Sequence, residues 1–151
     1  ITRIEGGTTH NIIPESVFLQ GTSRFLEPEA GVALHERFDQ ILQGVSAAHG
    51  CDAEIDWKDG YPVTRNDEGA YERWRIVMNE VFGPSQVLTM PPVMGGEDFS
   101  FYGEVIPACF FALGLLPAGQ DVMPGLHHPH FDFNDAAIEL GIKAFVGLTE
   151  T

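Results

Sequence analysis

The hydrophobic period of the sequence changes at Gly50, from the spacing of a helix to that of a strand. Before this point, one apolar helical stripe is formed by Leu34, Phe38, Ile41, Leu42 and Val45. Pro28 suits the first position of this helix, where its missing N–H has no partner, and Gly50 supplies the left-handed residue that commonly closes a helix. After it, residues 51–57 alternate strictly between apolar and polar, which predicts a strand with one exposed face.

Other segments continue this mixture of elements. Val17 to Phe25 is compatible with a strand having one covered face, and the continuously apolar segment Cys109 to Leu116 predicts a strand buried on both faces. A second amphipathic helix stops at Gly83-Pro84, and Asn134 or Asp135 can cap a last one. The stripe of the second helix is Tyr71, Trp74, Val77, Met78 and Val81, and that of the last is Ile138, Ile142, Phe145 and Leu148. These patterns predict an α/β fold without internal repeats, with a domain boundary in the turn-rich segment 61–67.

Composition excludes several kinds of partner. The chain has 22 acidic residues against 8 Lys and Arg, a formal net charge of −14. Nucleic acids and anionic membranes attract basic surfaces, so we predict that the chain binds neither. The longest apolar run, Ala108 to Leu116, is too short to cross a bilayer, and no targeting pattern opens the chain, so we expect a soluble, cytoplasmic protein. Cys51 and Cys109 stand far apart in strand-like surroundings and are interpreted as buried thiols.

A first group of candidate functional residues lies in Gly6 to Pro14 and in Gly21-Thr22-Ser23-Arg24. The amide of Asn11 offers a donor and an acceptor, and the guanidinium of Arg24 can hold a carboxylate through two parallel hydrogen bonds, which suits an amide-linked amino acid. His10 can polarise a carbonyl group. Alternatively, Asn11 and His10 serve a turn and Arg24 is an ordinary exposed strand residue.

A second group follows two glycines in Gly95-Gly96-Glu97-Asp98-Phe99. The glycines allow a sharp turn that brings the carboxylates of Glu97 and Asp98, or nearby peptide groups, close to a ligand. Asp98 can equally cap a short helix. Glu97 is less easily explained in structural terms, and both acids are candidates for lining a site.

A third group contains three histidines within four positions, in Leu126-His127-His128-Pro129-His130. Neutral imidazole is the favoured nitrogen ligand of zinc and related ions, so the segment predicts a metal ligand. Adjacent residues seldom hold one ion together, and we therefore expect one ligand from this segment. The alternative is a surface loop rich in histidine.

These motifs resemble, in order, those of the metallohydrolase family that contains aminoacylase, carboxypeptidase and hippurate hydrolase, and most closely its N-acyl-amino-acid amidohydrolase branch. Members typically show Gly-Gly-Thr-x-x-Asn-Val-Ile-Pro, Gly-Thr-x-Arg, Gly-Ser-Glu-Asp-Phe and Leu-His-Ser-Pro-x-Phe. The corresponding segments here are Gly6–Pro14, Gly21–Arg24, Gly95–Phe99 and Leu126–Phe131. This chain departs from the pattern at Gly96, where the family usually has Ser, and at His128 and His130, which replace Ser and an aromatic residue.

The resemblance implies a division of the chain into two parts. Residues 1–62 would be part of a ferredoxin-like lid or dimerisation domain, through which the protein would form a homodimer, and residues 63–151 would be the C-terminal part of the zinc-binding α/β domain. Asn11 and Arg24 would bind a small N-acyl amino acid or peptide, with His10 as a catalytic candidate. His127 would bind a divalent metal, zinc first, with manganese, cobalt or nickel as alternatives.

The resemblance also implies that essential residues are missing from this sequence. The remaining metal ligands and the glutamate that acts as general base would lie upstream of Ile1, whose surroundings read like a strand already under way. We therefore expect a fragment that is inactive alone, because a catalytic metal needs about three protein ligands and a base. The alternative to an enzyme fragment is a non-enzymatic dimerisation or ligand-binding module derived from such a hydrolase. An unrelated acidic ion-binding domain is disfavoured because no regular calcium loop occurs.

Overall fold

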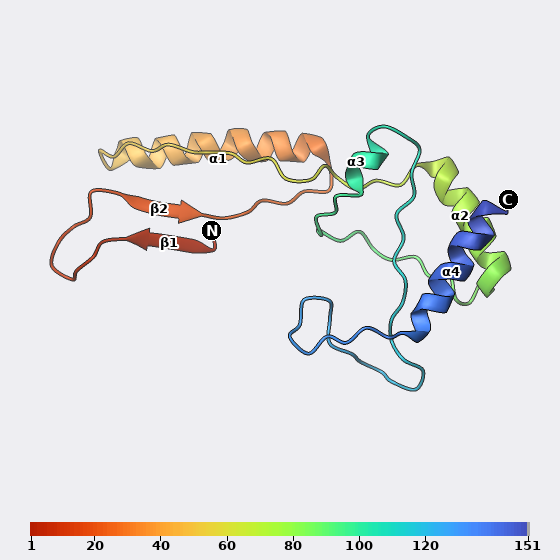
Figure 1. Ribbon diagram of the computed structural model, residues 1–151. Helices are drawn as coiled ribbons and strands as arrows, with labels where there is room; N and C mark the ends of the chain where they lie inside the picture. The colour runs from red at the N-terminus through yellow and green to blue at the C-terminus, as the bar shows by residue number, and fades with distance from the viewer. Residues whose placement is uncertain (151) are drawn as a thin grey trace. The chain divides into compact units, whose positions relative to one another are not determined.

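The computed structural model of the chain describes residues 1–150, which form two short strands and four helices (Figure 1). Contacts group them into two compact units. Unit 1 comprises residues 1–63 and 92–96, and unit 2 comprises residues 64–91 and 97–150. Helices and a small sheet are both present, as the sequence patterns predicted. None of the described helices is both long and apolar enough to cross a membrane.

The sheet of unit 1 is a pair of antiparallel strands, β1 (Arg3–Gly6) and β2 (Val17–Gln20). Arg3 lies opposite Gln20 and Gly6 opposite Val17. The predicted strand over residues 17–25 therefore exists but ends at Gln20. The prediction of one covered face is wrong, because Val17 and Leu19 are 52% and 50% exposed. Phe18, on the other face, is also 50% exposed. Two strands are too few to bury a face unless another layer packs on them.

Helix α1 (Pro28–Ala48) forms where the sequence predicted it. Pro28 occupies the start, and Gly50 adopts a φ of 65° just after the end, a conformation that glycine adopts without a steric penalty. Gly31 is the buried residue of α1, and the ring of Phe25 lies where a β-carbon at position 31 would stand. The predicted stripe is only partly covered, since Ile41 and Val45 are more than half exposed.

The predicted strand over residues 51–57 is wrong, because the segment is extended but pairs with no strand among residues 1–150. It lies instead along α1. The ring of Trp57 stacks on His35 with centroids 3.9 Å apart, and the edge of Phe38 approaches it at 5.4 Å. Gln43 Nε2 donates to the carbonyl of Ala53 at 3.1 Å. Of the alternating apolar residues only Ala53 and Trp57 are partly covered, and a strand also needs a neighbour for its backbone.

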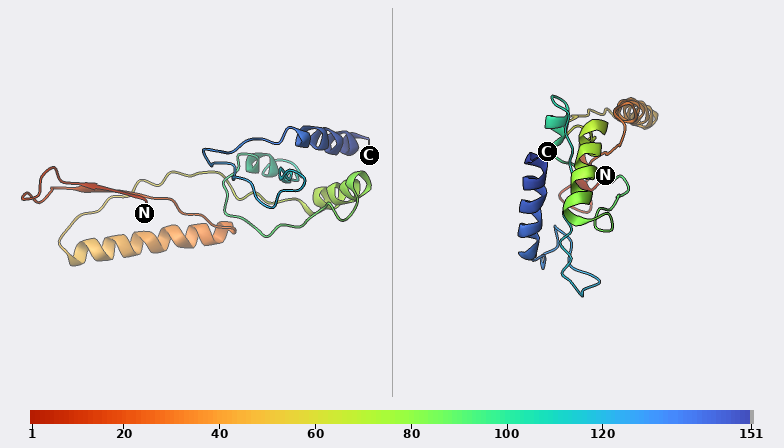
Figure 2. Two further views of the ribbon diagram at one scale, coloured as in Figure 1. Left: turned by 90° about the horizontal axis from the view of Figure 1, so that it is seen from below. Right: turned by 90° about the vertical axis from the view of Figure 1, so that its right-hand side faces the viewer.

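Unit 2 is built on the packing of α2 (Glu68–Phe82) against α4 (Ala136–Thr149), which lie side by side in Figures 1 and 2. The side chain of Asp67 caps α2 by accepting from the N–H of Ala70 at 2.8 Å, and Gly83 follows the helix with a φ of 84°. The core consists of Val77, Met78 and Ala144, surrounded by the partly buried Trp74, Phe82, Val87, Phe111 and Leu148. The predicted α2 helix is therefore confirmed.

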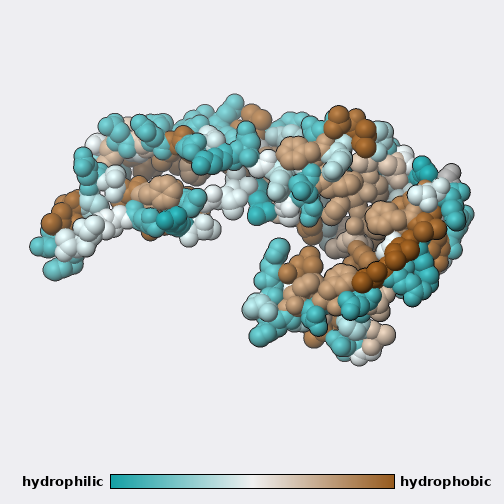
Figure 3. All heavy atoms as spheres, in the orientation of Figure 1, coloured by the Kyte–Doolittle hydropathy of each residue, from teal (hydrophilic) through white to brown (hydrophobic). Residues whose placement is uncertain are grey.

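Helix α4 also forms as predicted, but it packs through a different face. Its buried residues are Ala137 and Ala144, whereas Ile138, Ile142 and Phe145 are 52%, 59% and 63% exposed. Hydrophobic atoms accordingly reach the surface over α4 in Figure 3. The two stripes are offset by one residue, about 100° around the helix. Small residues face α2 because they allow the helix axes to approach closely. The predicted stripe was therefore wrong for Ile138, Ile142 and Phe145, whereas Leu148 packs against the core as predicted.

The segment 109–116 contradicts the prediction of a strand buried on both faces. It is extended without strand pairing in residues 1–150, and only alternate side chains are partly covered. The preceding Ala108 accepts from the N–H of Asp67 at 2.9 Å, and the side-chain amide of Asn66 makes two hydrogen bonds to the backbone of Phe110. Local side-chain bonds thus replace part of a strand ladder. The remaining helix, α3 (Ser100–Gly103), is a single turn.

Candidate functional site

The candidate residues are divided between the two units. His10, Asn11 and Arg24 lie in unit 1, and Glu97, Asp98 and His127 lie in unit 2.

His10 and Asn11 lie in an exposed turn between β1 and β2. Thr9 Oγ1 donates to Asn11 Oδ1 at 3.1 Å, which fixes the amide so that its Nδ2 faces away from that bond. The side chain therefore takes part in the turn, as one interpretation of the sequence held. It still retains two N–H donors that a ligand oxygen can accept.

Arg24 lies in the exposed segment between β2 and α1, where it contacts a part of the chain 70 residues away. Its Nη1 donates to the backbone carbonyl of Met94 at 2.9 Å. Within residues 1–150, its Nε and Nη2 donate to no protein atom. Two residues beyond Met94, Gly96 packs against the ring of Tyr61. No recognised motif includes Tyr61, which opens the turn-rich segment interpreted as a domain boundary.

Glu97 and Asp98 precede α3 and contact it through hydrogen bonds of their backbone carbonyls. The carbonyl of Glu97 accepts from Ser100 Oγ at 2.6 Å and from Ser100 N at 3.2 Å, and the carbonyl of Asp98 accepts from Phe101 N at 3.1 Å. No side chain caps α3 among the described residues, so the carboxylate of Asp98 does not serve as its cap. Glu97 is half-buried and Asp98 is exposed.

His127 lies in an exposed turn of the segment that leads to α4. Its neighbour His128 is used by the turn itself, because its Nδ1 accepts from the N–H of His130 at 3.1 Å. The rings of His128 and His130 stand 5.5 Å apart. In the part of the chain that the structure describes, the imidazole of His127 makes no hydrogen bond, so both of its ring nitrogens remain available.

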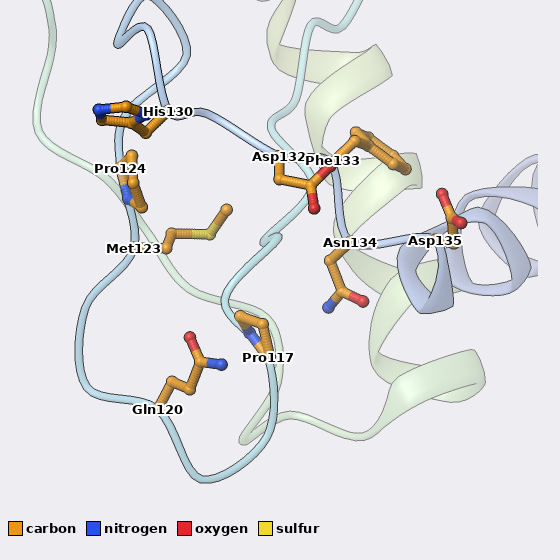
Figure 4. A pocket seen from close by; sticks show the side chains of 9 residues that line it. All are labelled: Pro117, Gln120, Met123, Pro124, His130, Asp132, Phe133, Asn134 and Asp135. Carbon is orange, nitrogen blue, oxygen red and sulfur yellow. The ribbon is translucent and has the colours of Figure 1, made fainter.

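A shallow pocket of about 330 Å³ opens beside this turn, and His127 does not line it (Figure 4). Its lining residues are Pro117, Gln120, Met123, Pro124, His130, Asp132, Phe133, Asn134 and Asp135. Asn134 is held by donation from its Nδ2 to the carbonyl of Leu115 at 3.2 Å, and its Oδ1 accepts from Ala136 N at the start of α4. The predicted capping role of Asn134 is thereby confirmed.

The described residues do not assemble a metal site by themselves. No three side chains of the His, Cys, Asp or Glu type come together in residues 1–150 in a way that could hold an ion. A catalytic zinc site usually takes three protein ligands. His127 is a suitable donor by its chemistry, but the donor set within this chain is incomplete.

The two cysteines offer no alternative chemistry. Cys51 is exposed, so the prediction that it is buried is wrong, and its Sγ lies 3.6 Å from the carbonyl of His49. Cys109 is partly buried, and this burial raises the pKa of its thiol. A raised pKa lowers the thiolate fraction at neutral pH, which makes Cys109 a poor nucleophile.

Comparison with known proteins gives a consistent result. The family model described as Peptidase family M20/M25/M40 matches residues 5–151. N-acetyl-L-cysteine deacetylase of Bacillus subtilis is 33% identical, with 100% of this chain and 34% of the relative covered. For N-acetyldiaminopimelate deacetylase of a Geobacillus species the identity is 33%, covering 97% and 37% of the two chains.

A plant relative, IAA-amino acid hydrolase ILR1-like 4 of Arabidopsis thaliana, is 30% identical over 93% of this chain and 33% of its own length. The chain therefore spans about a third of the length of the curated relatives it matches. No solved structure matches it.

Proposed function

Because the chain belongs to peptidase family M20/M25/M40, we propose that it is part of a metal-dependent hydrolase that cleaves the amide bond of N-acyl amino acids. The observation that carries this proposal is the family match over residues 5–151. Two relatives are named as deacetylases of N-acetylated amino acids, and a third as a hydrolase of IAA-amino acids. Such substrates combine an amide with a carboxylate, which suits the donors of Asn11 and Arg24.

In this proposal Arg24 binds the carboxylate of the substrate, and Asn11 donates to its amide or acyl oxygen. In the exposed guanidinium of Arg24, two nitrogens, Nε and Nη2, donate to no protein acceptor in residues 1–150. A guanidinium edge of this kind matches the two oxygens of a carboxylate. His10, in the same turn as Asn11, is the proposed catalytic residue.

His127 is the proposed metal ligand, with zinc as the first choice of ion. Its ring nitrogens make no hydrogen bond within the described chain, and imidazole is a donor that suits zinc and nickel. Manganese and cobalt are the other candidate ions. Because residues 1–150 contain no cluster of three donors, the remaining ligands and the general base would be supplied from outside this chain. Glu97 and Asp98 are proposed to line the site.

The division at residues 62 and 63 is part of the same proposal. Residues 1–62 would belong to a ferredoxin-like lid that also forms a homodimer, and residues 63–151 to the metal-binding domain. The main separation of the compact units, between Val63 and Thr64, supports this division, although residues 92–96 also belong to unit 1. The exposure of β1 and β2 on both faces supports a larger lid. A sheet of this kind needs further strands or another layer to become stable.

The test is a chimera in which this chain replaces the matched third of N-acetyl-L-cysteine deacetylase. We expect the chimera to hydrolyse N-acetyl amino acids with zinc, manganese or cobalt. Arg24→Ala should raise KM by about 10- to 100-fold, the range for a lost hydrogen bond to a charged group. His127→Ala should abolish turnover and lower the metal content, whereas His130→Ala, in the same loop, serves as the matched control.

The 151-residue chain alone provides the second arm of this test. With metal and substrate present, it should show no turnover above the rate of the metal alone. Turnover by the isolated chain would contradict the proposed incomplete site. A folded, metal-loaded chimera that works equally well with Ala at position 127 would contradict the proposed ligand.

A further inference from the structure

Arg24 contacts a cluster in unit 1 that includes Met94 and Tyr61, two residues outside the recognised motifs. Nη1 of Arg24 donates to the carbonyl of Met94 at 2.9 Å. A β-carbon built at Gly96 would lie 3.3 Å from Cδ2 of Tyr61 and 3.9 Å from Nη1 of Arg24. Gly96 therefore lies beside both the tyrosine ring and the guanidinium, and a side chain at this position would require the Tyr61 ring to move.

We propose that the Met94 carbonyl, supported by the packing of Tyr61 on Gly96, positions Arg24 so that its Nε–Nη2 edge faces a ligand carboxylate. This inference rests on the proposed function, in which Arg24 binds the carboxylate of an N-acyl amino acid. Tyr61 and Gly96 act through Arg24 and are positioning residues. They do not touch the substrate in this proposal.

The geometry of the guanidinium explains why one bond to Met94 is useful. Arginine carries five N–H donors in a rigid plane, and a carboxylate binds along one edge through two of them. With Nη1 bonded to a backbone carbonyl, rotation of the plane is restricted, and the opposite edge formed by Nε and Nη2 remains open. Ordering a long side chain before the ligand arrives reduces the entropy lost on binding.

The surroundings of Gly96 explain why a residue without a side chain suits this position beside Arg24 and Tyr61. Its φ is not in the left-handed region, so its backbone conformation does not require glycine. The preference for a small residue comes instead from the ring of Tyr61, 3.3 Å from the β-carbon position, while Nη1 of Arg24 lies at contact distance, 3.9 Å away. Gly95 has no atom within 4 Å of its β-carbon position, so Gly95→Val is the matched control for Gly96→Val.

The first measurement uses the full 151-residue chain without ligand. In 15N-labelled protein, the N–H groups of Arg24 are assigned by comparison with Arg24→Lys. We expect slow rotation about the Cζ–Nη1 bond in the wild-type chain, in Tyr61→Phe and in Gly95→Val. Tyr61→Ala and Gly96→Val should restore the fast rotation of a free guanidinium. Slow rotation that persists in Tyr61→Ala and Gly96→Val, or fast rotation in the wild type, would overturn the proposed positioning.

The second measurement adds N-acetyl-L-alanine, with its C-terminal amide as the control that lacks a carboxylate. We expect the acid to shift the Nε–H signal of Arg24 saturably while the 13C signal of the Met94 carbonyl stays in place. Tyr61→Ala should weaken this binding by about two- to tenfold, the effect of ordering one long side chain, and Tyr61→Phe should restore it.

The outcomes separate this inference from the function on which it rests. If the acid shifts both Arg24 and the Met94 carbonyl, the ligand displaces the carbonyl, and the proposed open edge is wrong. If rotation depends on Tyr61 but the acid moves no Arg24 signal, Arg24 is not a carboxylate site, which overturns its proposed role in substrate binding. If Tyr61→Ala binds the acid as tightly as the wild type, Tyr61 does not position Arg24.

Discussion

Replacing Gly31 by alanine should destabilise unit 1, although alanine is the better helix former. The β-carbon would lie 2.5 Å from Cζ of Phe25 and 2.6 Å from its Cε1. Carbon atoms pack at about 3.5–4.0 Å, so the ring must move by about 1 Å or the helix must shift. Overpacking of this kind costs about 1–3 kcal/mol.

Gly44, in the same helix, is the matched control because no atom lies within 4 Å of its β-carbon position. Gly44→Ala should stabilise α1 by about 0.5–1 kcal/mol through helix propensity alone. Gly31→Ala has the same propensity gain but also the clash, so the difference between the two variants isolates the packing term. We expect that difference in the free energy of unfolding to be about 1–3 kcal/mol.

Urea unfolding followed by tryptophan fluorescence measures this difference. The chain has two tryptophans, and Trp57 reports on unit 1 once Trp74 is replaced by Phe. A double-mutant cycle with Phe25→Ala identifies the cause, because the penalty at position 31 should disappear when the ring is absent. Equal stability of Gly31→Ala and Gly44→Ala, or a penalty that persists without the ring, would refute the reasoning.

Three further predictions concern unit 2. Asn66→Ala should destabilise it by about 1–3 kcal/mol, because both hydrogen bonds to the Phe110 backbone are lost; urea unfolding read by the tryptophan of that unit measures the effect. The raised pKa of Cys109 stabilises the folded chain below the pKa of the unfolded thiol, and this contribution is lost as pH rises through the folded pKa. Labelling of Cys109 by a disulfide reagent should therefore accelerate on unfolding and on raising the pH. The hydrogen bond and charge of Lys143 lower the pKa of Glu139. This exposed pair should therefore stabilise α4 above the unfolded pKa of a glutamate, and the effect should be lost as pH falls through the folded pKa. Circular dichroism should show that Lys143→Gln reduces this pH dependence of the helix content.

The sequence predicted those elements whose signals are local. Helix α1 begins at Pro28 and is followed by a left-handed Gly50, and each residue acts through its own backbone preference. Helix α4 was located correctly but oriented wrongly, because large apolar residues and small ones both form stripes on it. Ala144 and Gly147 face α2, where a β-carbon at 147 would come within 2.8 Å of Val81. Close helix contact selects small residues, which a count of large side chains does not detect.

The strand predictions failed because pairing is not a local property. Residues 51–57 have the alternation of a strand, yet Trp57 stacks on His35 of α1 and no strand lies beside the segment in the described chain. The same limit applies to the candidate site. Arg24 was selected from its motif, but its contact with Met94 spans 70 residues, and Tyr61 carries no motif at all. Only a structure brings these residues together.

Carboxylate binding and metal binding, the two parts of the proposed chemistry, require different arrangements of residues. They can therefore be tested separately in this chain. Binding a carboxylate requires one guanidinium in a fixed orientation, and Arg24, Met94 and Gly96 all lie within unit 1. Holding a catalytic metal requires several donors at one point, and residues 1–150 do not bring three together. If both proposals hold, the isolated chain should bind N-acyl amino acids weakly through Arg24 without hydrolysing them. Binding without turnover would then be a property of this chain, and turnover a property of the larger enzyme.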